Sequence, residues 1–253
     1  YSNIVGNEAG RIIYDGGSAI SASGEILAQG ISCHLEQILV HSADIEIADA
    51  RSSVCSPSRI VDFSWKTLVP NLETTDPAKN FSDNLQFARA VTLGLFDYQR
   101  KSKASGYVLS LSGGIDSSVC ALLVRYLISR IYSELSADAR LELPSVFHGE
   151  EADCCKGYMH CLYQSGAGST AETNRLASEL CQELEFSFSE TSVVDIVTQY
   201  EKLLGGIIGR ELTWANDDIA RQNIQARARS PLVWLLANVR NALLLVTSNR
   251  SEL

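Results

Sequence analysis

The sequence predicts an α/β fold, in which a doubly wound parallel sheet follows a short β segment. Two observations lead to this expectation. From residue 81 onward, short apolar runs alternate with longer segments whose apolar residues recur at helical spacing. Before residue 63, short extended runs alternate with glycine turns, which is typical of hairpins. Alternating strands and helices indicate a parallel sheet, and such sheets bind ligands at the carboxyl ends of their strands.

The composition indicates which kinds of partner to exclude and which cellular compartment to expect. The chain has 253 residues, 21 Lys and Arg, 30 Asp and Glu, and a net charge of −9. This acidic balance disfavours nucleic acid as a partner. No apolar stretch approaches the roughly 18 residues of a membrane span, so we expect no membrane partner. Seven scattered cysteines lack the even framework of a secreted disulfide scaffold, which favours a reducing, cytoplasmic location.

Three segments are predicted along the chain. Residues 1–62 contain extended runs at residues 11–15, 18–21, 25–29 and 43–47, with turns at Gly16-Gly17 and Ser23-Gly24 between the first three. About 60 residues of sheet without covering helices form less than a domain. Residues 63–80 have no sustained period and contain Pro70 and Pro77, so they are predicted to be a linker. Residues 81–253 form the α/β domain.

The first elements of this domain set up one unit of strand, glycine turn and helix. Apolar residues from Phe81 to Leu95 recur at helical spacing after Ser82 or Asp83, and Gly106 ends that segment. Residues 107–111 are a short apolar run and predict a strand. In the helix that follows, the inner face is predicted to carry Val119, Leu122, Leu123, Tyr126, Leu127 and Ile131.

The later elements repeat the alternation. Ser169 and Glu172 fit a capping box before a helix that carries Leu176, Leu180 and Leu184. A strand at residues 186–189 comes next, and then a helix at 193–204 that Gly205-Gly206 interrupts. The last elements are a long helix at 217–238, which would tolerate Pro231, and a closing strand at 242–247.

The chemistry is predicted at Ser112–Ser118, sequence SGGIDSS, between the strand at 107–111 and its helix. Glycines let backbone N–H groups turn toward an anion, and the helix N-terminus adds unpaired donors and partial positive charge. The serines add hydroxyl donors, and Asp116 offers a carboxylate for Mg²⁺ that bridges the same phosphates. No Lys lies between Lys103 and Lys156, so a Walker-type transfer of the γ-phosphoryl group is disfavoured. The plain alternative is a glycine turn that caps a helix.

This loop resembles the pyrophosphate loop of N-type ATP pyrophosphatases, which hold the β and γ phosphates as a leaving group and put AMP on a substrate oxygen. GMP synthetases, asparagine synthetases and tRNA-modifying enzymes share it. Residues 221–229 and 246–253 resemble, respectively, a substrate helix and a strand-end motif of NAD synthetases. Residues 1–30 resemble the last strands of the nitrilase-type glutaminase that precedes the synthetase in glutamine-dependent NAD synthetases.

The resemblance to glutamine-dependent NAD synthetases implies an adenine nucleotide alpha hydrolase-like fold in residues 81–253 and a chain truncated at both ends. It implies amidation of deamido-NAD to NAD, with ATP cleaved to AMP and pyrophosphate, ammonia supplied from glutamine, and Mg²⁺ as the metal. A homo-oligomer formed through the synthetase domain is also implied. The alternatives are another pyrophosphate-loop amidotransferase and a nucleotide-binding fragment without turnover.

The loop and the resemblance together imply a set of site residues. Those for ATP are Ser110, Leu111, Ser112, Gly113, Gly114, Ile115, Asp116, Ser117, Ser118 and Thr247, with Ser112 and Asp116 as the catalytic residues. Those for the substrate are Tyr163, Ser165, Asn223, Gln225, Arg227 and Glu252, and Asp116 and Glu252 are the metal ligands.

Some of these features have simpler interpretations. Arg221, Arg227 and Arg229 could form a solvated helix face, but residues 216–253 hold five Arg against three acids, which favours an anion site. Residues 163–165 resemble a family segment that lies beside ATP, but they could be a loop that only caps the next helix. Cys33 follows an extended run rather than the family's nucleophile position, so it is not expected to act as the nucleophile of an amidase.

Overall fold

The structure is a computed structural model, and it describes residues 1–8, 12–45 and 82–247. The chain divides into two compact units, residues 1–90 and 91–253, which we describe one at a time. The predicted linker at 63–80 lies outside the described residues, as do Cys55, Glu252 and the end of the predicted extended run at 43–47. The described part of that run, residues 43–45, contains no strand.

The first unit contains two antiparallel strand pairs. Strand β1 (Val5–Glu8) pairs with β2 (Ile12–Asp15), and β3 (Ala19–Ala22) pairs with β4 (Glu25–Gln29). The last three strands confirm the predicted runs, whereas β1 was not predicted. The β3–β4 turn has Ser23 at φ 52° and Gly24 at φ 89°. Positive φ at both central residues matches a type I′ hairpin turn, whose twist suits the flanking strands.

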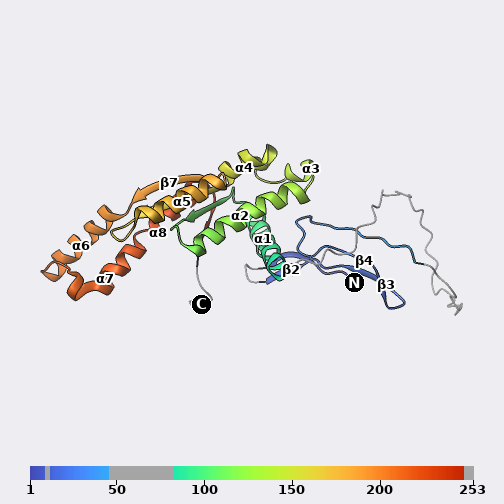
Figure 1. The fold of residues 1–253 in the computed structure, drawn as a ribbon, viewed down its shortest axis with the longest axis horizontal. Helices are drawn as coiled ribbons and strands as arrows, with labels where there is room; N and C mark the ends of the chain where they lie inside the picture. Colours follow the sequence, from blue (N-terminus) through green and yellow to red (C-terminus); the bar gives the residue numbers. More distant parts are fainter. Residues whose placement is uncertain (9–11, 46–81, 248–253) are drawn as a thin grey trace. The chain divides into compact units, whose positions relative to one another are not determined.

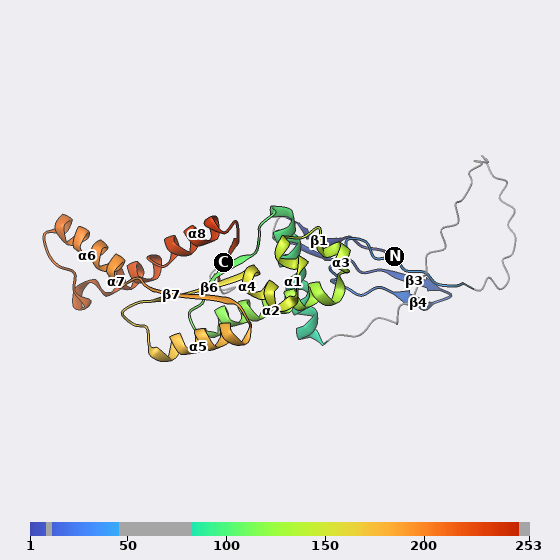
Figure 2. The same cartoon turned by 90° about the horizontal axis from the view of Figure 1, so that it is seen from above.

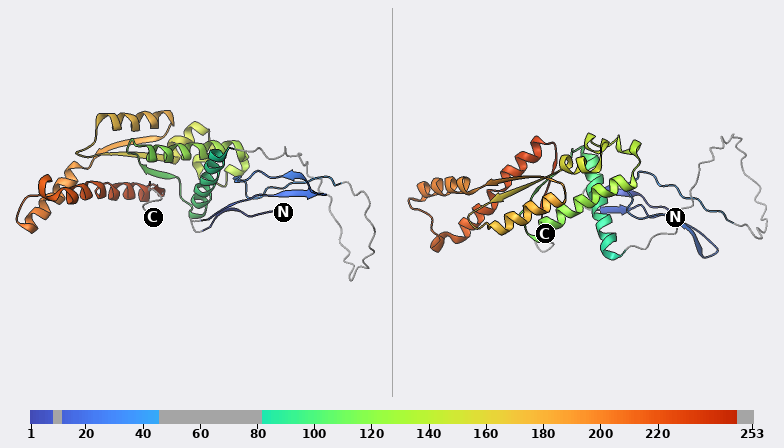
Figure 3. Two further views of the ribbon diagram at one scale, coloured as in Figure 1. Left: turned by 60° about the horizontal axis from the view of Figure 1, so that its bottom comes forward. Right: turned by 45° about the horizontal axis from the view of Figure 1, so that its top comes forward.

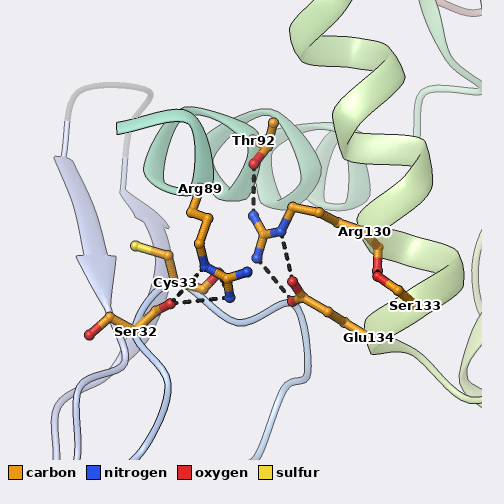
Figure 4. A network of polar contacts seen from close by, with 7 residues as sticks. All are labelled: Ser32, Cys33, Arg89, Thr92, Arg130, Ser133 and Glu134. Carbon is orange, nitrogen blue, oxygen red and sulfur yellow. Dashed lines mark hydrogen bonds and ion pairs between the residues drawn. The ribbon is translucent and has the colours of Figure 1, made fainter. Parts of the chain in front are cut away.

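A buried arginine ties a loop of the first unit to the start of helix α1 (Asp83–Ser102). The Arg89 guanidinium donates to the carbonyl oxygen of Ser32 at 3.3 and 3.4 Å and to that of Cys33 at 3.4 Å (Figure 4). Such bonds lower the cost of burying the Arg89 side chain, because they give its N–H donors acceptors in place of water. Cys33 itself is buried, which removes its thiol from solvent.

The second unit is built on a four-stranded parallel sheet. Its strands are β5 (Tyr107–Ser110), β6 (Met159–Ser165), β7 (Ser187–Ser192) and β8 (Leu243–Leu245). They lie in the order β7-β6-β5-β8, and every pair is parallel. The chain thus moves outward from β5 through β6 to β7 and returns to the other side of β5 at β8. This reversal confirms the doubly wound sheet and creates a switch point beside β5, where such folds bind ligands.

Helices cover both faces of this sheet. The helices of this unit after α1 are α2 (Ile115–Glu134), α3 (Ala137–Arg140), α4 (Glu151–Tyr158), α5 (Ala171–Glu183), α6 (Val194–Ile208), α7 (Trp214–Arg227) and α8 (Ser230–Val239), with a 3₁₀ turn at Ser145–His148, and those that pack on the sheet are α2, α4, α5 and α8. Val233 and Ala237 of α8 pack on Val108 and Leu162. Helices α2, α4 and α5 lie against the opposite face, and Figures 2 and 3 show the sheet between the two layers.

The predicted helix at 217–238 is wrong, because two helices occupy that stretch. Helix α7 ends at Arg227, and α8 begins at Ser230 with Pro231 in its first turn. Proline has no N–H to donate to the preceding turn, so it is tolerated only where a helix starts. Figure 1 shows α7 and α6 extending past the carboxyl end of the sheet, while α8 returns along it.

Two helix boundaries also differ from the prediction. Helix α6 runs through Gly205 and Gly206 and ends at Ile208, and the next residue, Gly209, provides the left-handed C-terminal cap with a φ of 72°. The predicted capping box is one residue too early: Thr170 caps α5, with its hydroxyl accepting from the Thr173 N–H at 3.2 Å. The strand at 186–189 is confirmed as β7, and the closing strand is confirmed as β8.

The inner face of α2 is rotated from the predicted one. Leu127 and Ile131 are buried as expected, but Val119 and Leu122 are about half exposed. Arg130 is buried on this helix, where it donates to Thr92 of α1 at 2.7 Å and forms an ion pair with Glu134 (Figure 4). A charged residue at an inner position hides the true face from a hydropathy pattern. Within the described residues, no helix is long and apolar enough to span a membrane.

Candidate pyrophosphate-loop site

The predicted loop connects the carboxyl end of β5 to the start of α2. Gly114 is the N-cap of α2 and supplies no side-chain cap. Gly113 has a φ of 78°, and a Cβ atom there would collide with the carbonyl oxygen of Thr173. Gly113 is therefore needed for the backbone path itself, because left-handed φ and close approach both disfavour a side chain there.

Serine hydroxyls hold this loop closed from inside. The buried Ser117 Oγ lies 3.1 Å from Ser112 Oγ, accepts from the Ser112 N–H at 3.3 Å, and donates to the Gly114 carbonyl at 3.1 Å. Ser112 Oγ in turn accepts from the Gly114 N–H, and Ser118 Oγ donates to the Gly114 carbonyl at 2.8 Å. These bonds fix the loop's shape before any ligand arrives.

The start of α2 offers free backbone donors. The first regular helical bond here runs from the Ser118 N–H to the Gly114 carbonyl at 3.2 Å. Among the described residues, the N–H groups of Ile115, Asp116 and Ser117 have no acceptor. Unpaired N–H groups and the positive end of the helix dipole bind anions, phosphate above all. The arrangement is therefore chemically suited to a phosphate group.

Asp116 places an exposed carboxylate in the same first turn. The described residues contain no group of three His, Cys, Asp or Glu that could enclose a metal by itself. Mg²⁺ is ordinarily held by one or two carboxylates together with substrate phosphates, so a single Asp beside a phosphate cradle fits that ion.

Cys120 lies one helical turn after Asp116. The pKa of its thiol is raised, mainly by burial and to a smaller extent by the negative charge of Asp116. Cys120 therefore stays protonated at neutral pH and is a poor nucleophile.

A pocket of about 410 Å³ opens beside the loop, at the carboxyl ends of β5 and β6. Its lining includes five predicted site residues, namely Ser110, Leu111, Ser112, Tyr163 and Gln225. It also includes five residues absent from the predicted set, namely Gln164, Gly168, Ser169, Thr173 and Arg229. This volume lies in the range of small-molecule sites.

Tyr163 and Gln164 line this pocket from β6, a strand that the sequence did not reveal. The Tyr163 hydroxyl lies 2.9 Å from Thr173 Oγ1 of α5. The Gln164 side chain is 5% exposed; its Oε1 accepts from Ser110 Oγ at 3.4 Å, and its Nε2 donates to the Arg229 carbonyl at 3.1 Å. A buried polar residue in a strand gives no apolar signal, so only a search for strand ends beside the loop could have found it.

The remaining predicted residues lie elsewhere. Asn223 and Arg227 are exposed on α7 and do not line the pocket. Ser165 Oγ donates to the Thr191 carbonyl at 3.2 Å. Thr247 follows β8 at the same edge of the sheet, next to β5.

The three arginines that the sequence grouped together have different roles. Arg221 pairs with Glu201 at 2.7 Å and lies over the Trp214 ring, so its charge is used within α6 and α7. Arg227 is exposed, as described above. Of the three, only Arg229 lines the pocket. The anion-site interpretation therefore suits Arg229, and the solvated-face interpretation suits the exposed Arg227.

The doubly wound sheet and its phosphate-suited loop at the switch point define a nucleotide-binding α/β protein. A family model described as NAD synthase matches residues 87–253. The chain therefore belongs to the NAD synthase family, and its second unit has the adenine nucleotide alpha hydrolase-like fold of that family.

Relatives and solved structures extend this likeness beyond the family model. The glutamine-dependent NAD(+) synthetases of Drosophila melanogaster and Homo sapiens are 26% and 25% identical to this chain; each match covers 94% of the chain and 34% and 38% of those proteins. A crystal structure of a glutamine-dependent NAD(+) synthetase from Cytophaga hutchinsonii matches the whole chain and 40% of its own length, at 34% identity and a TM-score of 0.80. The chain thus spans about two fifths of the length of these relatives.

Proposed function

We propose that this chain supplies the part of a glutamine-dependent NAD synthetase that cleaves ATP and amidates deamido-NAD. The observation that carries the proposal is the SGGIDSS loop, whose free N–H groups begin α2 at the switch edge of the sheet. The pocket beside the loop has room for a substrate group. The matches to glutamine-dependent enzymes cover both units, which supports glutamine as the ammonia source of the whole protein.

The proposed reaction has two steps. The nicotinate carboxylate of deamido-NAD attacks the α-phosphorus of ATP, and the bond from that phosphorus to the bridging oxygen breaks, so pyrophosphate leaves. Ammonia then attacks the adenylated carbonyl carbon, a C–N bond forms, AMP leaves with the C–O electron pair, and one proton is lost. The loop's backbone N–H groups stabilise the charge on the departing pyrophosphate, and the internal Ser117 bonds keep those donors in position.

Mg²⁺ would be held by the Asp116 carboxylate, with Glu252 as the second ligand that the resemblance implies. When bound, the ion would neutralise phosphate charge. The substrate residues Asn223, Arg227 and Ser165 and the ATP residue Thr247 remain proposals. Asn223 and Arg227 lie on the exposed side of α7, where a dinucleotide longer than the pocket could reach them.

The test is the identity of the nucleotide product. The chain is incubated with ATP, Mg²⁺, deamido-NAD and ammonium, and the nucleotides are separated by chromatography. We expect AMP, pyrophosphate and NAD in equal amounts. Equal amounts of ADP and phosphate would contradict the proposal, and AMP formation that does not require deamido-NAD would point to another pyrophosphate-loop enzyme.

We also propose a cytoplasmic location and a homo-oligomer that assembles through the second unit. The described residues contain six free cysteines, which suits a reducing compartment. Self-association is supported by exposed apolar side chains on α8, where Trp234, Leu235 and Val239 are 55%, 60% and 84% exposed. Light scattering of the purified chain would give the subunit number.

A further inference from the structure

Gln164 and Arg229 form a reciprocal pair that the sequence did not predict, although Arg229 was one of the three arginines of the predicted anion site. The Gln164 Nε2 donates to the Arg229 carbonyl at 3.1 Å, and the Arg229 Nε donates to the Gln164 carbonyl at 3.1 Å. The two residues are 65 positions apart, one at the end of β6 and the other just before α8. The side chain of each residue therefore holds the backbone of the other.

Backbone carbonyls orient the Arg229 guanidinium through Nε and Nη1, and the N–H groups of Nη2 stay available for a ligand. Besides the bond to Gln164, its Nη1 donates to the Gln225 carbonyl at 3.0 Å. Its Nη2 has no acceptor among the described residues, although Arg229 lines the pocket. Carbonyl oxygens do not neutralise a guanidinium as a carboxylate would, so Arg229 brings a full positive charge to the pocket.

Gly166 shows how closely the guanidinium is confined. A Cβ atom at this position would lie 2.8 Å from Arg229 Nη2. Nη2 is the far end of a flexible side chain, so an Ala at position 166 would displace it and alter the bonds that the guanidinium makes to the two carbonyls. Gly166, which has no side chain, leaves Nη2 in the position that these bonds set.

On these grounds we propose that Arg229 contacts a phosphate group of the nucleotide through Nη2, and that Gln164 is a positioning residue that acts through Arg229. The proposal rests on the proposed function, since it assigns ATP to this pocket. Among the three arginines of α7 and the α7–α8 junction, Arg229 alone combines a place in the pocket lining with donors that have no partner in the described residues. Arg229 lies between the end of α7 and the start of α8, and its two bonds to Gln164 hold it at the end of β6.

The test measures ATP binding by titration calorimetry on the whole 253-residue chain. Arg229→Ala should weaken ATP binding by about 10- to 100-fold, the loss of one charge-assisted contact. Arg175→Ala is the matched control, because Arg175 is exposed on α5 and pairs only with Glu172 and Glu179 there. Wild-type chain that binds no ATP would overturn the proposed function as well. Binding that is normal in both wild type and Arg229→Ala would overturn only the role of Arg229.

A double-mutant cycle tests the positioning role. Gln164→Ala and Gly166→Ala should each weaken ATP binding by about 5- to 30-fold in the wild-type background and by less than about 2-fold when Arg229 is already Ala. Effects that persist in the Arg229→Ala background would show that positions 164 and 166 act directly, and would overturn the positioning role.

Gln99→Ala separates positioning from loss of stability. Gln99 is also a buried glutamine, but it bonds to the Ala104 carbonyl and the Tyr158 hydroxyl at the amino-terminal edge of the sheet. Thermal unfolding should show comparable destabilisation for Gln99→Ala and Gln164→Ala, while only Gln164→Ala weakens ATP binding. Equal loss of ATP affinity in both variants would reduce Gln164 to a purely structural residue.

Discussion

Gly113 is the loop position at which the backbone least tolerates a side chain. Its φ of 78° and the adjacent Thr173 carbonyl leave no room for a Cβ atom. We expect Gly113→Ala to lower the free energy of unfolding by at least about 1–2 kcal/mol, the cost of a left-handed Ala, and to abolish ATP binding as the loop shifts. Chemical denaturation measures the first effect and calorimetry the second.

The control for this substitution lies in a helix of the same unit. Gly206 is inside α6, and a Cβ atom there meets open space. Gly206→Ala should raise stability by about 0.5–1 kcal/mol and leave ATP affinity unchanged. A stable Gly113→Ala chain that binds ATP normally would show that the backbone at position 113 is not fixed as described.

Asp116 should matter for turnover and little for folding. Because its carboxylate is exposed, Asp116→Asn removes charge without opening a cavity. We expect the rate of AMP release to fall by about 100-fold or more and the magnesium concentration needed for half-maximal rate to rise, with thermal unfolding nearly unchanged. Asp195→Asn is the matched control, an exposed Asp in the first turn of α6. Unaltered magnesium dependence in Asp116→Asn would exclude the metal role.

Among the elements, α5 has a start that can be tested directly. The structure assigns the cap to Thr170, whereas the sequence favoured Ser169. Thr170→Ala should cost about 1 kcal/mol of stability, and Thr170→Ser should recover most of it, since either hydroxyl can accept from the Thr173 N–H. Denaturant unfolding of the three chains provides the comparison. If Thr170→Ala leaves the free energy of unfolding unchanged, Thr170 is not the cap and Ser169 is the better assignment.

The elements that the sequence revealed are those with a clear local signal, which for the buried strand β5 is a short apolar run just before the glycines of the loop. The strand β5, the helices α1 and α5, and the hairpin β3–β4 all carry a clear period or turn signal. Strand β6 escaped because it is buried along almost its whole length and includes His160 and Gln164, so no alternation is visible. The division between α7 and α8 was missed because a helical period continues across Pro231.

The part of the site that the sequence revealed is also the part with a local signal. Sequence-local geometry, a strand followed by glycines and a helix, was sufficient to find the loop at 112–118. Gln164 and Arg229 reach the pocket through bonds over 54 and 65 residues of chain, and nothing in the residues near either one indicates such a partner. Long-range polar contacts are therefore the part of a site that a single sequence conceals.

At the scale of the whole chain, we expect no release of ammonia from glutamine. Amide hydrolysis of this type needs a thiolate beside a base. Cys33 is buried, its carbonyl is bound by Arg89, and residues 1–62 contain no Lys. Incubation of this chain with glutamine, ATP and deamido-NAD should yield no glutamate, while ammonium should support NAD formation. Glutamate production that Cys33→Ser abolishes would show that Cys33 is the nucleophile.

The residues that line the pocket are far apart in the chain, so the pocket cannot form until late in synthesis. Ser110 leaves the ribosome first, Gln164 follows 54 residues later, and Arg229 another 65 residues after that. At ordinary translation speeds this interval is on the order of ten seconds. For that time the nascent loop lacks Arg229, so if ATP binds as proposed, we expect it to stabilise the finished unit and to give the emerging strands little help. The first strands of the sheet must therefore reach their places by packing alone, before the nucleotide can contribute.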